Sequence, residues 1–219
     1  MSDTDSFINE VSEEVRRDAL YGYLRRYGWI AILVVVLLVG GAAYNEYNKA
    51  QTTAASQDAG DQLLTALAQD DLAARAEALT QVDVNGPAVA VAALLTAATQ
   101  YEAEQFADAA VTLDTLADNA DVPLEYRELA ALKSAMLPND DVDARMAQLE
   151  TLAQPGATYN LIAREQIGLM QAQAGDTDTA IATMRAIVDD AGATRGLRER
   201  AQTLIVALGG DLTAPETTE

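Results

Sequence analysis

The sequence contains neither cysteine nor histidine among its 219 residues. Without cysteine, the chain has no disulfide, iron–sulfur cluster, thiolate zinc site or thiol nucleophile. Without histidine, it has no imidazole base, no Ser-His-Asp triad and no histidine metal ligand. The absence of cysteine fits any compartment, including an oxidising one, where a stray thiol would be a hazard.

Basic and aromatic residues are also scarce. Lys and Arg number 14 against 34 Asp and Glu, which gives a net charge of −20, and aromatic residues make up 5% of the chain. We expect no nucleic-acid partner, because contacts to phosphates need clustered basic residues. Half of the residues are hydrophobic, and about one residue in five is alanine. Because alanine is the best helix former, this composition favours an all-α fold with closely packed helices.

Motifs that carry chemistry are missing as well. The sequence has no GxGxxG or P-loop pattern, and it holds only five serines and two lysines. We therefore expect no catalytic residue, cofactor, metal site or small-molecule substrate; an enzyme on an unrecognised helical fold is the alternative. Acidic clusters around Asp71, Asp141 and Asp176 lack the spacing of an EF-hand loop. Each lies where a helix is expected to begin, which favours helix N-caps over cation sites.

The longest apolar run extends from Tyr27 to Tyr44 without a charge. A helix of this length spans roughly 27 Å, close to the ~30 Å hydrocarbon core of a bilayer. Tyr27 and Trp29 at one end, and Tyr44 and Tyr47 at the other, match the aromatic belts of the two membrane interfaces. We predict a transmembrane helix over residues 27–47. The alternatives are a buried core helix and a cleaved signal peptide, although the latter normally has a short, basic n-region.

The basic residues near this helix predict its orientation. Arg16, Arg17, Arg25 and Arg26 precede it, whereas Lys49 is the only basic residue among the twenty that follow. By the positive-inside rule, the N-terminus is cytoplasmic and the large C-terminal part is exported.

The exported part contains an internal repeat. Triplets of mostly apolar residues recur with internal spacings of 7 and 3, and their starts are separated by 34, 36 and 35 residues. The triplets are Leu72, Leu79 and Val82; Phe106, Leu113 and Leu116; Val142, Leu149 and Leu152; and Thr177, Met184 and Ile187. Each triplet lies on one face of a helix, and a second helical pattern precedes it, at 56–69, 87–104, 124–137 and 158–174. Two helices per unit at this period are typical of tetratricopeptide repeats, with an ordinary antiparallel helical bundle as the alternative.

These patterns divide the chain into four parts. We predict a cytoplasmic amphipathic segment at 1–26, the transmembrane helix at 27–47, a tetratricopeptide-like helical-repeat (α-solenoid) domain at 48–210 and a disordered tail at 211–219. The prediction of an amphipathic segment at 1–26 depends on the apolar stripe formed by Ile8, Val11, Val15 and Ala19, and solvated coil is the alternative.

A last, unpaired helix is expected at 194–208, where it would cap the solenoid. Its Arg195, Arg198 and Arg200 give it a polar outer face, and Gly209-Gly210 ends it.

The N-terminal motif carries a family resemblance. The segment Glu10-Val11-Ser12-Glu13-Glu14-Val15-Arg16-Arg17-Asp18, and then Arg25-Arg26-Tyr27-Gly28-Trp29, precede a single span and an alanine-rich repeat domain. This arrangement resembles the bacterial ancillary SecYEG translocon subunit family, in architecture over nearly the whole chain. The resemblance implies a single-pass inner-membrane protein with a periplasmic domain. It also implies association with the export channel subunits and with periplasmic chaperones, to the benefit of exported clients.

The function that these features favour is a membrane-tethered protein-interaction module. Stacked helix pairs form a groove lined by the first helix of each unit, and such grooves bind partner proteins. Tyr101 and Tyr126, near the ends of two first helices, are candidates to line it, although both are also suited to filling the core between repeats. A scaffold or assembly factor that coordinates cell-envelope growth or division is the alternative function.

Overall fold

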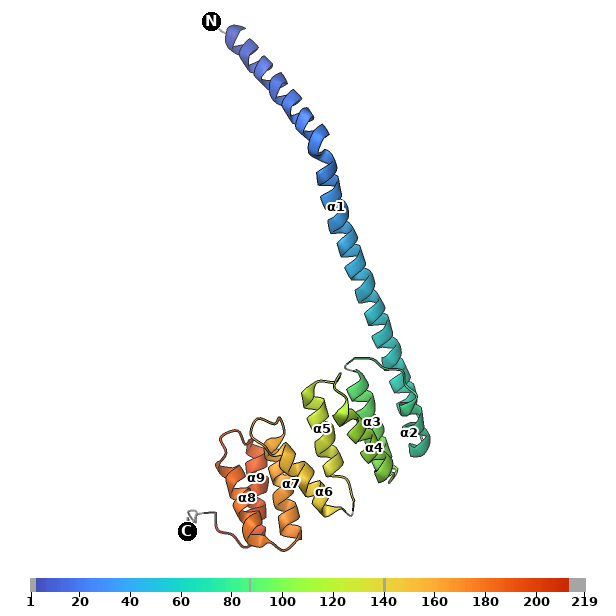
Figure 1. The fold of residues 1–219 in the computed structure, drawn as a ribbon, viewed down its shortest axis with the longest axis vertical. Helices are drawn as coiled ribbons and strands as arrows, with labels where there is room; N and C mark the ends of the chain where they lie inside the picture. The colour runs from blue at the N-terminus through green and yellow to red at the C-terminus, as the bar shows by residue number, and fades with distance from the viewer. Residues whose placement is uncertain (1–2, 87, 140, 213–219) are drawn as a thin grey trace. The chain divides into compact units, whose positions relative to one another are not determined.

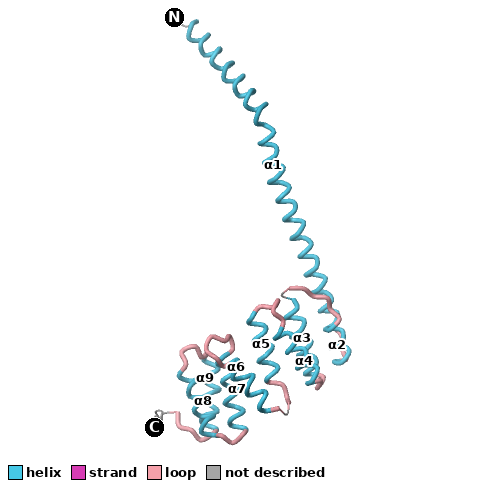
Figure 2. The backbone as a smooth tube through the Cα atoms, in the orientation of Figure 1, coloured by secondary structure: helices cyan, strands magenta, loops and turns pink. Residues whose placement is uncertain are grey.

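The computed structural model describes the backbone of residues 3–86, 88–139 and 141–212, and the side chains from residue 25 onward except that of residue 31. Over these ranges the chain consists of helices joined by loops, without a strand (Figure 2). It divides into two compact units, residues 1–57 and residues 58–219. The predicted all-α class is therefore confirmed.

A single helix, α1 (Asp3–Leu67), makes up most of the first unit, and its last turns belong to the second. From Asp3 onward, the predicted segments 1–26 and 27–47 are thus parts of one continuous helix. The physical reason is that the first proline of the sequence is Pro87, so that nothing in this stretch interrupts the backbone hydrogen bonds. The predicted apolar stripe from Ile8 to Ala19 lies outside the residues whose side chains are described.

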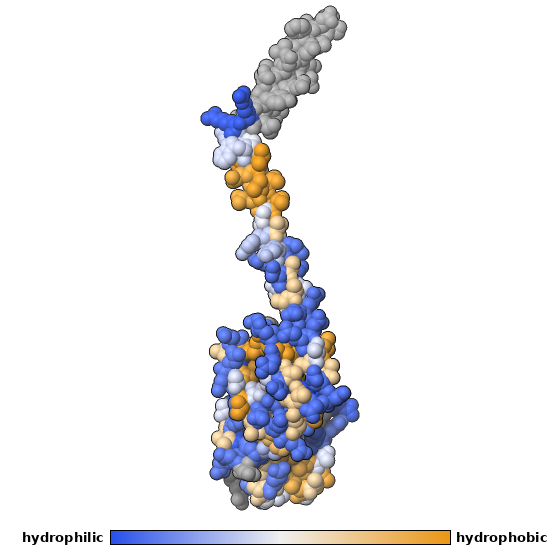
Figure 3. Space-filling view, turned by 90° about the vertical axis from the view of Figure 1, so that its right-hand side faces the viewer, coloured by the Kyte–Doolittle hydropathy of each residue, from blue (hydrophilic) through white to orange (hydrophobic). Residues whose placement is uncertain are grey.

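The apolar run of α1 is exposed along its described length and forms a hydrophobic band in Figure 3. By length and composition, the part of α1 from Arg25 to Leu67 contains a candidate membrane span, the only one in the described part of the chain. An N-terminal signal sequence passes the same test, so that both interpretations of this helix stay open.

The second unit is a succession of short helices that stack in sequence order (Figure 1). They are α2 (Leu72–Thr80), α3 (Ala88–Glu102), α4 (Phe106–Asp118), α5 (Leu124–Ala135), α6 (Val142–Leu152), α7 (Asn160–Gln173), α8 (Thr177–Asp189) and α9 (Arg195–Ala207). From α2 to α9, each helix packs mainly on the helix before or after it in the sequence. The predicted first helices at 87–104, 124–137 and 158–174 correspond to α3, α5 and α7, with ends that differ by a few residues, and the predicted last helix corresponds to α9. The predicted separate helix at 56–69 is wrong, because this stretch, up to Leu67, is the C-terminal part of the continuous helix α1.

The sequence triplets coincide with the second helix of each pair. The first members, Leu72, Phe106, Val142 and Thr177, are the first residues of α2, α4, α6 and α8. The middle members, Leu79, Leu113, Leu149 and Met184, are all at most 2% exposed. These four side chains therefore mark equivalent core positions in successive units.

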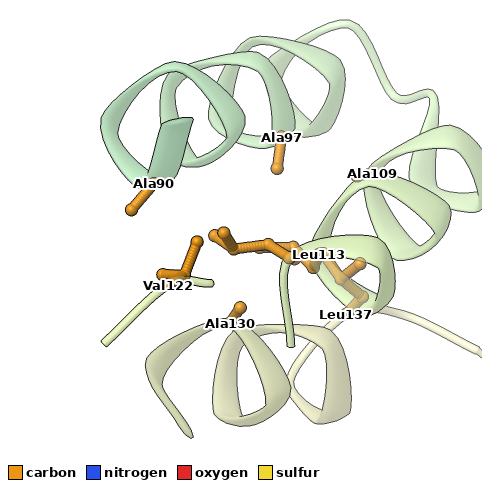
Figure 4. Close-up of a cluster of buried hydrophobic side chains, with 8 residues drawn as sticks. Ala90, Ala97, Ala109, Leu113, Val122, Ala130 and Leu137 are labelled. Atoms are coloured by element: carbon orange, nitrogen blue, oxygen red, sulfur yellow. The ribbon is translucent and has the colours of Figure 1, made fainter. Parts of the chain in front are cut away.

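Three clusters of buried side chains make up most of the core of this unit in the described part of the chain, and Leu79 of α2 is buried outside them. The first joins α3, α4 and α5, the second joins α5, α6 and α7, and the third centres on α8 and α9. In the first cluster, Ala97 of α3 and Ala130 of α5 point toward Leu113 of α4 from opposite sides (Figure 4). The second helices α4 and α6 are thus each covered by the first helices before and after them, as expected of a solenoid whose units contact only their neighbours.

Residues in the left-handed backbone conformation, with positive φ, make two of the turns between paired helices tight. Glu104 has φ +59° between α3 and α4, and Gly175 has φ +82° at the equivalent place between α7 and α8. The next backbone N–H closes each turn, since Gln105 donates to the carbonyl of Gln100 (2.8 Å) and Asp176 to that of Gln171 (3.0 Å). This geometry is that of a Schellman motif, in which glycine is favoured and glutamate is strained.

Candidate protein-interaction surface

The acidic residues that precede the second helices act as N-caps. The carboxylates of Asp71, Asp141 and Asp176 accept hydrogen bonds from the backbone N–H three residues later, at 2.8, 2.9 and 3.3 Å. They satisfy N–H groups that have no partner within the helix and lie at the positive end of its dipole. The N-cap prediction is therefore confirmed for these three residues, whereas Asp140 lies outside the described residues.

The same polar contact occurs within two of the helix pairs, α3 with α4 and α7 with α8. The Thr112 hydroxyl donates to Oε1 of Gln100 at 2.8 Å, and the Thr183 hydroxyl donates to Oε1 of Gln171 at 2.8 Å. Each contact joins a first helix to the second helix of the same pair. In both cases a buried or half-buried amide receives a partner, which keeps the two helices in register. The apolar triplets did not reveal these residues, although the shared Gln-x11-Thr spacing is present in the sequence.

The first helices α3, α5 and α7 expose apolar side chains at equivalent positions. The buried residues Ala97, Leu132 and Gly168 align the three helices. Six residues before them lie Val91, Tyr126 and Ile162, all at least 37% exposed, and four residues after the first two lie Tyr101 and Met136, both about half exposed. We call these five residues, Val91, Tyr101, Tyr126, Met136 and Ile162, the apolar ridge. Their recurrence with the repeat makes them candidates for a contact surface, which in proteins is marked by a contiguous exposed apolar patch.

A cavity of about 400 Å³ opens between the C-terminal halves of α3 and α5. Its walls come from α3, from the end of α5 and from the two residues that follow α5, and Leu113 of α4 contributes from the core. The lining residues are Ala97, Ala98, Tyr101, Glu102, Leu113, Lys133, Met136 and Leu137. The cavity is therefore mostly apolar, with one carboxylate and one ammonium group among its lining residues.

The structure places the two predicted groove residues differently. Tyr101 lines the cavity, and its ring lies 5.4 Å from that of Phe106 at an interplanar angle of 60°. Tyr126 is partly exposed on α5 but is not among the residues that line this cavity. Both belong to the apolar ridge, and their role in binding stays a prediction. Sequence reasoning missed Val91, Met136 and Ile162, which are found by extending the repeat period to the first helices.

An ion pair ties the last helix to α7. The Arg200 guanidinium donates through Nε and Nη2 to the two carboxylate oxygens of Glu165, at 2.6 and 2.8 Å. The Glu165 side chain is only 9% exposed. Its hydrogen bond raises the pKa of Arg200, against a smaller opposing effect of burial. The Arg200 side chain itself is 60% exposed, as expected of the polar outer face of the last helix, but sequence reasoning did not predict that it also pairs with the buried carboxylate of Glu165.

The other two arginines of α9 differ from each other. Arg195 pairs with Glu199 one turn later, at 2.7 Å, and both side chains are exposed, as expected of an outer face. Arg198 donates to the carbonyl of Asp190 at 3.5 Å and thus reaches back toward the loop before the helix.

The predicted membrane-anchor residues lie on α1. Tyr27, Trp29, Tyr44 and Tyr47 are each at least half exposed. The guanidinium of Arg26 lies 6.0 Å from the centre of the Tyr27 ring. Arg25 and Arg26, two of the four residues of the predicted topology signal, are exposed. The side chains of the other two, Arg16 and Arg17, lie outside the described residues.

Comparison with known proteins agrees with this architecture. The sequence matches the tetratricopeptide repeat-like domain family over residues 22–205, and the chain belongs to this family. Domains of this class are protein-interaction modules and are typically non-catalytic. No curated protein and no solved structure matches the chain.

Proposed function

We propose that this protein is a membrane-anchored interaction module and an accessory of the SecYEG export channel. In this proposal its repeat domain contacts channel subunits, periplasmic chaperones or exported clients, and thereby helps exported proteins. The observation that carries the proposal is the combination of a tetratricopeptide-like solenoid, which exposes an apolar ridge and a cavity, with an exposed apolar run on α1.

The proposed location is the bacterial inner membrane, in a single pass. The N-terminus lies in the cytoplasm and the repeat domain in the periplasm, because four arginines precede the apolar run and one lysine follows it closely. From residue 45 onward, 28 acidic and 10 basic residues give a net charge of −18. This charge keeps the domain soluble and away from anionic lipid headgroups.

The anchor matters because it confines a weak binder near its partners. Linking two modules raises the effective concentration of one at the other to about the millimolar range. In the tethered protein, the contacts of a single groove therefore suffice to keep a partner bound. The free domain at cellular concentrations leaves most partners unbound.

A soluble fragment that starts at Gln51 tests this proposal. We expect it to fold, to bind at high concentration and to fail to replace the full chain in cells at native levels. A chimaera in which an unrelated span replaces residues 28–44 should restore activity if α1 only anchors the domain. If the chimaera fails, the span itself docks, with Gly40 and Gly41 as the surface for close helix packing. Full replacement of the native protein by the soluble fragment at native levels would contradict the proposal.

A further inference from the structure

We infer that the cavity between α3 and α5 receives a bulky apolar side chain from a positively charged segment of a partner protein. This inference rests on the proposed function as an interaction module. It adds to that function the chemistry of the partner and the residues that contact it.

The shape of the cavity favours an apolar side chain. Small residues on the α3 side, Ala97 and Ala98, line the cavity together with Leu113, which belongs to the buried core. Figure 4 shows Ala97 pointing toward Leu113. Tyr101 and Met136 line the same cavity while about half of each stays exposed, so an inserted side chain buries apolar surface on both helices. A cavity of about 400 Å³ has room for a large aromatic or aliphatic side chain.

The negative charge of the repeat domain selects the partner. Residues 70–125, which include α2, α3 and α4, contain 11 acidic residues and one basic residue, Arg75. Glu102 places one of these carboxylates in the lining itself, and Lys133 on the α5 side is the only basic lining residue. Because Glu102 and Lys133 balance within the lining, the attraction of a positively charged segment comes from the negative charge of the domain as a whole. A second copy of this chain would bring the same negative charge and is disfavoured.

The apolar ridge offers further apolar side chains outside the cavity. Val91, on α3 like Tyr101, is exposed, and Tyr126 and Ile162 occupy the equivalent places on α5 and α7. A partner segment with more than one apolar residue therefore gains further contacts, while the cavity holds the central anchor.

Peptide binding to the full-length chain in phosphatidylcholine nanodiscs tests this inference. The probe is a fluorescent peptide of Lys, Gly and Ser with one central Trp, and its dissociation constant is measured by fluorescence anisotropy. Two matched peptides replace the Trp by Ser or every Lys by Glu. We expect the first peptide to bind, and each matched peptide to bind at least about tenfold more weakly.

Two substitutions then locate the site. Ala98→Phe fills the mouth of the cavity, and Glu102→Lys reverses the charge of its lining. Both positions are exposed, so that circular dichroism should show an unchanged fold. The controls are Ala186→Phe on α8 and Glu150→Lys on α6, which are exposed and distant in sequence from the cavity. Each cavity variant should weaken binding by about tenfold, and each control by less than about twofold.

Equal binding of the wild-type chain and Ala98→Phe would overturn the inference, as would equal binding of the Lys and Glu peptides. Its failure is separable from failure of the proposed function. If no probe binds up to about 1 mM while the wild-type chain still retains specific proteins on purification from membranes, only the cavity assignment is wrong. If the wild-type chain retains none, the proposed function fails as well.

Discussion

Truncation of Leu149 should destabilise the repeat domain far more than truncation of Val142, although both residues belong to one sequence triplet. Leu149 is 1% exposed within the cluster shared by α5, α6 and α7, whereas Val142 is 54% exposed at the start of α6. Leu149→Ala removes three buried carbon atoms, worth about 2.4 kcal/mol at ~0.8 kcal/mol each. The cavity left behind brings the expected loss to about 3–4 kcal/mol. Val142→Ala should cost less than about 0.5 kcal/mol.

Urea unfolding of the fragment that starts at Gln51, followed by far-UV circular dichroism, measures these losses. Leu113→Ala and Met184→Ala, at the equivalent positions of other units, should behave like Leu149→Ala. Glu150→Ala changes an exposed neighbour and serves as the control. Equal shifts for Leu149→Ala and Val142→Ala would refute the assignment of the repeat register to the core.

Three further predictions concern turns, charge and topology. Glu104→Gly should stabilise the domain by up to about 1 kcal/mol in thermal melts and Gly175→Ala should destabilise it by about 1 kcal/mol, because both positions have positive φ; opposite signs would contradict the turn geometry. Arg200→Met should lower the free energy of unfolding in urea by about 2 kcal/mol or more, because it leaves the buried carboxylate of Glu165 without a charged partner. Glu165→Gln keeps a hydrogen-bond acceptor and should cost less than about 1 kcal/mol. The reverse order would mean that the pair contributes little. A reporter that is active only outside the cytoplasm should be active when fused after Glu219, and neutral replacements of the four arginines before the span should mix its orientation; activity of a cytoplasmic reporter alone would reverse the topology.

The repeat helices could be predicted from the sequence because their apolar spacing is regular. Period and burial coincide at Leu79, Leu113, Leu149 and Met184, and the aspartates that start helices carry their own signal. The continuity of α1 was not predicted. The composition changes from apolar to polar at both ends of the run from Tyr27 to Tyr44, which suggested helix boundaries that the backbone does not have.

Contacts between distant residues were beyond sequence reasoning. The arginines of the last helix look alike in sequence, but Arg200 bonds to a carboxylate 35 residues away, which only the packing of α9 near α7 determines. The cavity was also hidden, since small residues of α3 line it together with Leu113 of α4. Tyr101 could be chosen from its place near a helix end, whereas Met136 becomes apparent only when the repeat period is extended to the first helices.

The central claim is that this protein acts by holding an interaction domain at the membrane, next to its partners. The most direct measurement is the identification, by mass spectrometry, of proteins that co-purify with the full chain after mild detergent extraction, compared with a chain truncated after residue 57. We predict that subunits of the export channel and periplasmic chaperones are enriched, and that the enrichment is lost on truncation. Enrichment of division or wall-synthesis proteins instead, or equal recovery with the truncated chain, would contradict the account.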